Sequence, residues 1–308
     1  MGDARRIVSL LPSATEMICA LGLADRLFGI THECDFPPGL AGKTVVVRSV
    51  LPIERMSPAE IDRAVSERLQ SGQSLYEIRE DMVRAIRPDL VVTQDLCDVC
   101  APSGLDLRQM IEALPERPEV LSLTPRSLDE IFENIRSLGQ ATGRLREAEA
   151  LIAERRDRLA KLAARTAALA TRPRVFCMEW LDPVYGCGHW VPEMVNLAGG
   201  RDALGRKHTD SIRIAWKDVC AFDPEVLIVM PCGYGLAKAA EQAQRLENYP
   251  GWRDLAAVRT NRVYAVDANA YFARPGPRVV DGVELLAHLI HPEALAWSGA
   301  TDSFCAIA

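Results

Sequence analysis

The sequence predicts an α/β protein built from two parallel-sheet, Rossmann-like lobes that are joined by one long α-helix. Three observations carry this prediction. Strand-like runs alternate with helical patterns in both halves of the chain, a long helical tract separates the halves, and an internal repeat relates them. We expect an N-terminal α/β lobe over 1–125, a helical segment over 126–172 that includes the interlobe helix, and a C-terminal α/β lobe over 173–308.

Short runs rich in β-branched and aromatic residues supply the predicted strands. They cover 6–11, 26–31, 90–94 and 119–123 in the first half, and 174–180, 226–231 and 262–267 in the second half. Helical patterns lie between successive runs, and a helical crossover is the usual connection between parallel strands. Two parallel sheets covered by helices are therefore expected.

The helical tract between the lobes has apolar residues at spacings of three and four. The pattern runs from Leu128 to Leu138, breaks at Gly139 and Gly143, and resumes at Leu145. We expect the second helix to run from about Leu145 to about 171, because Pro173 ends it. At about 1.5 Å per residue this helix would be roughly 40 Å long, enough to cross a domain.

The repeat pairs segments from the two halves. Residues 16–29 and 193–205 share a Glu-Met pair that is followed by a short helix and a glycine. Residues 87–92 and 223–228 both lead from a helix stop into a buried strand. Such self-similarity indicates two equivalent lobes.

Composition narrows the function classes. The chain has 308 residues, of which 48% are hydrophobic and 25% charged, as in ordinary globular proteins. The net charge of −6, without a long basic run, argues against a nucleic-acid partner. No run reaches the roughly 18 apolar residues of a membrane span, so no membrane insertion is expected. The apolar stretch 7–23 is interrupted by Pro12 and is not an export signal, which predicts a cytoplasmic protein.

Cysteines gather after the predicted strands. Five of the nine follow strand ends, and two histidines share their loops; this set consists of Cys34, Cys97, Cys100, Cys187, Cys232, His32 and His189. Thiolate and imidazole suit zinc, Cu(I), an iron–sulfur cluster or the cobalt of a corrinoid. A redox dithiol and inert loop thiols are the alternatives. Cys19, Cys177 and Cys220 lie in apolar patterns and are assigned to the core.

No catalytic constellation is recognised, so no catalytic residue is assigned and the chain is not expected to be an enzyme. The sequence has neither a P-loop nor a GxGxxG motif, which leaves nucleotide chemistry without support. Ser13 and Thr15 follow the first strand, but the segment lacks a Gly-x-Ser-x-Gly nucleophile elbow. Glu16 lies three residues after Ser13. Their spacing predicts a capping box at a helix start.

Four segments resemble a known family. They are Arg6-Ile-Val-Ser-Leu-Leu-Pro-Ser-Ala-Thr-Glu16, Arg87-Pro-Asp-Leu-Val-Val92, Asp182-Pro-Val-Tyr-Gly-Cys-Gly188 and Tyr271-Phe-Ala-Arg-Pro-Gly-Pro-Arg278. Together they are similar to the class III solute-binding proteins (the class III periplasmic-binding-protein-like fold), specifically the cobalamin-binding branch of vitamin B12 ABC transport. The resemblance implies two lobes on a single helix, a small-molecule or metal-complex ligand held in the cleft between them, and an ABC permease as partner.

The resemblance also implies a ligand and a binding set. It points to a cobalamin or another corrinoid, or a related metal complex, with Tyr185 and Tyr271 where the family places ligand-facing aromatic residues. Ser13, Trp190, Arg274 and Arg278 complete the candidate cofactor-binding residues, with favourable charge at a helix end as the alternative role of the two arginines. The alternatives on the same fold are a thiolate-rich metal-ion or Fe–S protein and, less favoured, a cobalamin-remodelling or metal-handling enzyme.

Overall fold

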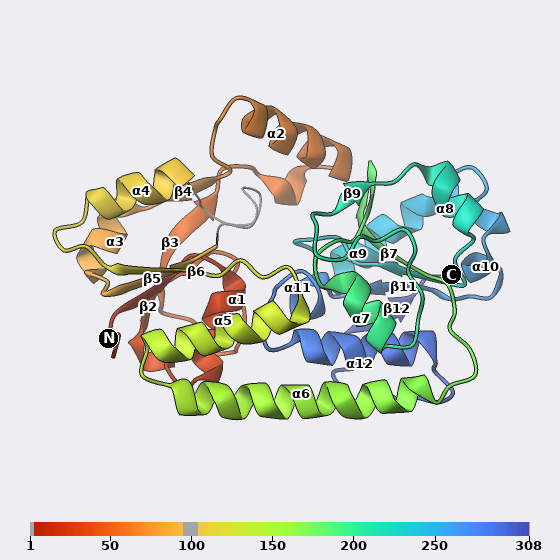
Figure 1. The fold of residues 1–308 in the computed structure, drawn as a ribbon. Helices are drawn as coiled ribbons and strands as arrows, with labels where there is room; N and C mark the ends of the chain where they lie inside the picture. The colour runs from red at the N-terminus through yellow and green to blue at the C-terminus, as the bar shows by residue number, and fades with distance from the viewer. Residues whose placement is uncertain (1–2, 95–103, 308) are drawn as a thin grey trace. The chain divides into compact units, whose positions relative to one another are not determined.

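The computed structural model describes residues 3–94 and 104–307. The chain divides into two compact units. Unit 1 comprises residues 1–125 with 129–153, and unit 2 comprises residues 126–128 with 154–308. Figure 1 shows that each unit is a sheet with helices packed on it, which confirms the predicted α/β class. None of the helices in the described ranges is long and apolar enough to cross a membrane.

Unit 1 has a six-stranded sheet in the order β4-β3-β2-β1-β5-β6. Its strands are β1 (Ile7–Ser9), β2 (Leu27–Thr31), β3 (Thr44–Ser49), β4 (Tyr76–Ile78), β5 (Leu90–Thr93) and β6 (Glu119–Ser122). All neighbours are parallel except β4, which pairs with β3 in antiparallel fashion. The parallel strands align their carboxyl ends at one edge of the sheet, where the loops that follow them can form a site.

Helical segments connect the strands of this sheet. They are α1 (Pro12–Ala20), η1 (Ala24–Arg26), η2 (Ile53–Arg55), α2 (Pro58–Gln70), α3 (Glu80–Ile86) and α4 (Gly104–Glu112). The capping box predicted at Ser13 is wrong, because α1 begins at Pro12 with Leu11 as its N-cap and no side chain caps it. Proline suits the first helical position, which moves Ser13 inside the first turn. A capping box occurs instead at α2, between Ser57 and Glu60.

The helical tract consists of α5 (Leu128–Ala141) and α6 (Leu145–Ala167). An added Cβ at Gly139 would lie 2.6 Å from the Ala148 side chain, so only glycine permits the close approach of the two helices. The single long helix is confirmed, although it ends at Ala167 and not near 171. Its last turn tightens, since the N–H groups of residues 168 and 169 donate to carbonyls three residues back.

Unit 2 has a six-stranded sheet in the order β12-β11-β10-β7-β8-β9. Its strands are β7 (Val175–Leu181), β8 (Val184–Gly186), β9 (Ile212–Arg213), β10 (Val226–Val229), β11 (Val263–Val266) and β12 (Phe304–Ala306). The predicted strands β7, β10 and β11 are parallel. The sheet is mixed because β8, β9 and β12 pair in antiparallel fashion, and the β7–β8 link is too short for a crossover.

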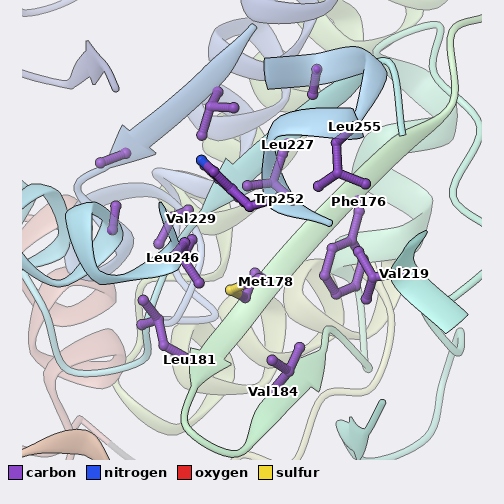
Figure 2. Packing of buried hydrophobic residues seen from close by; sticks show 14 of the residues in the cluster. Phe176, Met178, Leu181, Val184, Val219, Leu227, Val229, Leu246, Trp252 and Leu255 are labelled. Atoms are coloured by element: carbon purple, nitrogen blue, oxygen red, sulfur yellow. The ribbon is translucent and has the colours of Figure 1, made fainter. Parts of the chain in front are cut away.

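The helices of unit 2 surround its sheet. They are α7 (Val191–Leu197), α8 (Trp216–Phe222), α9 (Leu236–Ala243), η3 (Gln244–Asn248), η4 (Trp252–Asp254), α10 (Ala256–Arg259), α11 (Ala268–Tyr271) and α12 (Val279–Ile290). Figure 2 shows the core cluster of this unit, in which the Phe176 ring lies beside Val219 and Met178 lies on the side of Leu246. Burial of these large side chains supplies the main stabilising free energy of the unit.

Candidate functional site

The first candidate segment of unit 2 is the β7–β8 hairpin with the loop that follows it. Tyr185 of β8 is half-buried and pairs across the sheet with Arg213 of β9. Arg213 Nε donates to the Tyr185 phenol oxygen at 2.9 Å, and its guanidinium lies 5.7 Å from the ring centroid. The arginine therefore fixes the orientation of a ring that the family resemblance assigns to the ligand.

Glu179, near the end of β7, forms hydrogen bonds with three other segments of unit 2. Its carboxylate accepts a hydrogen bond from the Ser211 hydroxyl at 2.5 Å, and the Cys187 thiol also bonds to it. Its backbone carbonyl accepts from the Cys232 N–H at 3.2 Å. Burial raises the pKa of Glu179 above its ordinary value. The sequence reasoning missed Glu179, although a carboxylate inside the apolar run of β7 was a usable signal.

The loop at Gly188 and His189 is packed tightly against residues 208–211. An added Cβ at Gly188 would lie 2.3 Å from the Thr209 carbonyl oxygen, so this position requires glycine. His189 has a φ of 52° and donates its N–H to the same oxygen at 2.7 Å. Its Nε2 lies 3.4 Å from Asp210 Oδ1, but burial is the larger effect and lowers the pKa of His189. The imidazole is therefore neutral at pH 7.

The two other aromatic candidates of unit 2 differ in how much of the ring is free. Trp190 is only 5% exposed, and its indole N–H donates to the Phe272 carbonyl at 2.9 Å, so it packs the interior of the unit. Tyr271 ends α11 and is half-buried. Its hydroxyl lies 2.9 Å from the Ser303 hydroxyl, and its ring meets Trp297 edge to face. Tyr271 thus keeps an oriented ring that is partly accessible.

The remaining candidates for contact with the ligand are two arginines and a serine. Arg274 and Arg278 are half-buried in the segment between α11 and α12, and Arg278 is the N-cap residue of α12. Ser13 lies in unit 1, inside α1, and is only 3% exposed. Its burial leaves the hydroxyl little surface with which to touch a ligand.

Unit 1 contains a pocket of about 350 Å³ beside the end of β2, and His32 and Cys34 are among its lining residues. Both ring nitrogens of His32 already have backbone partners. Nδ1 lies 3.2 Å from the Val47 carbonyl oxygen, and Nε2 lies 3.4 Å from the Ser49 N–H. The Cys34 thiol lies 3.1 Å from the Thr15 hydroxyl. The His32 ring and the Cys34 thiol are therefore engaged in hydrogen bonds within the pocket wall and are not held in place as metal ligands.

The thiolate metal centre expected from the sequence gains no support. Across residues 3–94 and 104–307, no group of three or more His, Cys, Asp or Glu side chains could hold a metal ion. Cys187 is 1% exposed, and burial raises its pKa well above the ordinary value, so it is a protonated thiol. Cys232 is exposed on the loop after β10. Cys97 and Cys100 lie outside the described residues.

Known proteins resemble this chain over nearly its whole length. A family model described as periplasmic binding protein matches residues 7–270. A substrate-binding lipoprotein of an ABC transporter from Bacillus subtilis, itself uncharacterised, is 23% identical over 94% of this chain and 81% of the relative. The vitamin B12-binding protein of Vibrio cholerae is 25% identical over 91% of this chain and 87% of the relative.

Solved structures share the fold. A periplasmic haem-binding protein from Pseudomonas aeruginosa superimposes with a TM-score of 0.73 at 22% identity, covering 99% of this chain and 98% of that protein. The periplasmic vitamin B12-binding protein of Vibrio cholerae superimposes with a TM-score of 0.67 at 21% identity, covering 95% of this chain and 98% of that protein. At this identity the likeness establishes the fold, which is that of the class III binding proteins.

These relatives also bear on function and location. The Bacillus relative is named as a substrate-binding protein of an ABC transporter and the Vibrio relative as a vitamin B12-binding protein, which agrees with the prediction of a binding protein and not an enzyme. The prediction of a cytoplasmic location is wrong. The Bacillus relative is a lipoprotein and the superimposed Vibrio protein is periplasmic, which points to a place outside the cytoplasm. From the match over residues 7–270 it follows that this chain belongs to the periplasmic binding protein family.

Proposed function

We propose that this chain binds a corrinoid of the cobalamin type and presents it to the permease of an ABC transporter. The observation that carries the choice of ligand is the pair of oriented, half-buried rings of Tyr185 and Tyr271 in unit 2. Several relatives named for vitamin B12 or cobalamin support it. One of these, the cobalamin-binding protein of Halobacterium salinarum, is 23% identical over 94% of this chain and 70% of the relative.

The side chains around Tyr185 and Tyr271 suit a corrinoid. A corrin is a broad, largely apolar ring edged with amide groups, so it needs flat apolar surface together with hydrogen-bond donors at its rim. The tyrosine rings offer the surface, and the hydroxyl or guanidinium groups beside them offer the donors. Arg274 and Arg278 are proposed to contact the amide or phosphate groups, since a guanidinium presents several donors in a fixed fork.

Haem is the ligand against which the proposal must be tested, because structural neighbours include haem-binding proteins. The test is a set of titrations of the purified chain with cyanocobalamin, haemin and a ferric hydroxamate, followed by calorimetry and by the absorption bands of each ligand. The proposal expects saturable one-to-one binding of cyanocobalamin and weaker binding of the other two. Tight binding of haemin or the ferric hydroxamate, with none of cyanocobalamin, would assign the chain to a different solute.

A further inference from the structure

Two buried cysteines of unit 2 lie opposite each other on neighbouring strands. Cys177 is in β7, and Cys187 directly follows β8. The antiparallel register pairs Met178 with Gly186, so the next pair outward is Cys177 with Cys187. The Cys187 N–H donates to the Cys177 carbonyl oxygen at 3.3 Å, which confirms this pairing. Opposed residues of antiparallel strands have Cα atoms about 4.5–5.5 Å apart, within the roughly 4.4–6.8 Å range of disulfides.

The two side chains share one face of the sheet. Phe176 and Met178 point into the core cluster of Figure 2, so Cys177 between them points to the opposite face. Directly opposed residues of an antiparallel pair point the same way, which places the Cys187 thiol beside that of Cys177. Cys177 is 0% exposed and Cys187 is 1% exposed, and both are free thiols in the structure. Burial raises the pKa of both, and each thiol is therefore protonated.

We propose that Cys177 and Cys187 form a cross-strand disulfide in the exported protein. The proposal rests on the location outside the cytoplasm that the family indicates and is independent of which solute the chain binds. The sequence analysis had assigned Cys177 to the core and Cys187 to a metal site. The disulfide gives the two residues one shared role.

The oxidation is a thiol–disulfide exchange with a disulfide-bearing oxidant. The thiolate of one cysteine attacks a sulfur of the oxidant, forms a mixed disulfide and releases one oxidant thiol. The second cysteine thiolate attacks the protein sulfur of that mixed disulfide and releases the other thiol. The two cysteines lose two protons and two electrons, and the oxidant disulfide becomes two thiols. The exchange takes place before the hairpin is buried, because the folded thiols are protonated and inaccessible.

The bond would fix the start of the loop that carries Gly188 and His189. Cys187 is the first residue after β8, where this loop begins, so a covalent bond to β7 limits how far the loop can separate from the sheet. Oxidation removes the thiol proton that Cys187 shares with Glu179. Glu179 keeps the hydrogen bond from Ser211, so no buried carboxylate is left without a partner.

One peptide reports the bond directly. Trypsin cuts after Arg174 and Arg201, and the peptide between these sites contains Cys177 and Cys187 and no other cysteine. The full chain is exported from a bacterial host, unfolded without reductant in N-ethylmaleimide and digested. The proposal expects this peptide to carry no maleimide and to be lighter than the dithiol form by two hydrogen atoms. After reduction it should take up two maleimide groups.

Serine variants test whether the disulfide joins Cys177 and Cys187 and no other cysteine. In Cys177→Ser and in Cys187→Ser the remaining thiol of the peptide should be alkylated without reduction. Cys220→Ser, in α8 of the same unit, should leave the peptide oxidised. Reductant should lower the melting temperature of the wild type and leave that of the double serine variant unchanged. Two maleimide groups on the unreduced wild-type peptide would overturn the proposal, and this measurement stands even if a variant fails to fold.

Discussion

Arg213 holds the ring of Tyr185 from two directions, with its Nε 2.9 Å from the phenol oxygen and its guanidinium over the face of the ring. The pair exists because β8 and β9 place the two residues directly opposite each other. A ring fixed in this way loses little conformational freedom when a ligand packs on it, which favours binding. The hydroxyl orients the ring, and the ring itself would supply the contact surface.

Tyr185→Ala is expected to weaken corrinoid binding by roughly 1–3 kcal/mol, because it removes a large aromatic surface from the proposed contact. Tyr185→Phe is the matched control. It keeps the ring and loses only the bond to Arg213, and should cost less than about 1 kcal/mol. Calorimetric titration measures both. Equal affinities of the alanine variant and the wild type would place the ligand away from this ring.

Gly282→Ala tests how Tyr271 is positioned. An added Cβ at this position in α12 would lie 2.3 Å from the Tyr271 carbonyl oxygen and 2.8 Å from Met194 Cε. The overpacking should lower the free energy of unfolding by about 1–3 kcal/mol and weaken ligand binding through the displaced ring. Gly235→Ala is the control, since it has a φ of −76° and no atom within 4 Å of the added Cβ. Urea unfolding should show a lower free energy of unfolding for Gly282→Ala than for Gly235→Ala. Equal values would show that α11 can move away from the added methyl group without loss of stability.

Asp202 should make the stability of unit 2 depend on pH. Burial raises its pKa from 3.8 to about 6, although its carboxylate accepts bonds from the N–H groups of Leu204 and Gly205 at 2.9 and 2.8 Å. The folded state therefore keeps a proton that the unfolded chain loses, and stability falls as pH rises from about 4 to about 6. The loss is on the order of 3 kcal/mol and is complete above about pH 6.

Asp202→Asn should flatten this dependence, since the amide keeps an acceptor oxygen and does not titrate. Asp157→Asn, on the exposed side of α6, is the comparison variant and should leave the slope unchanged. Free energies of unfolding at several pH values between 4 and 7 give the slopes. A slope of the Asp202→Asn variant as steep as that of the wild type would assign the pH dependence to another carboxyl group.

Arg158 of α6 should contribute more to stability than its neighbours on the same helix. It donates to Glu284 and Asp281 of α12 with bonds of 2.6–3.0 Å, and all three side chains are at most 30% exposed. Arg158→Met should cost about 1–2 kcal/mol, because Glu284 loses its hydrogen-bonded arginine and Asp281 keeps only the longer ion pair with Arg155 at 3.6 Å. Lys161→Met removes an exposed pair with Asp157 and should cost less than about 0.5 kcal/mol. Thermal unfolding measures the stability of both variants. Equal losses of stability in Arg158→Met and Lys161→Met would contradict the expected larger contribution of Arg158.

Long apolar runs explain why much of the fold could be predicted. The runs at 174–180, 226–231 and 262–267 became β7, β10 and β11 with shifts of one or two residues at the ends. The strands that the sequence analysis missed lie toward the outer parts of the sheets, where a strand can be short. β8 and β12 have three residues each, too few for alternation of polar and apolar side chains to be recognised.

The candidate site was harder to predict because its contacts depend on register and burial. Arg213 meets Tyr185 only through the pairing of two short strands, and no spacing in the sequence reveals it. Cys187 does follow a strand, as expected, but its side chain points into the interior. A position after a strand end indicates which loop a residue belongs to, whereas the direction of the side chain is decided by packing around it.

Titration of the exported, ligand-free chain with cyanocobalamin tests the central claim most directly. The proposed function predicts saturable binding of one corrinoid per chain, accompanied by a change in the corrin absorption bands and weakened in Tyr185→Ala. Absence of binding by a folded chain, shown to be folded by a cooperative thermal transition, would contradict it. In that case the chain would remain a periplasmic binding protein for a solute other than a corrinoid.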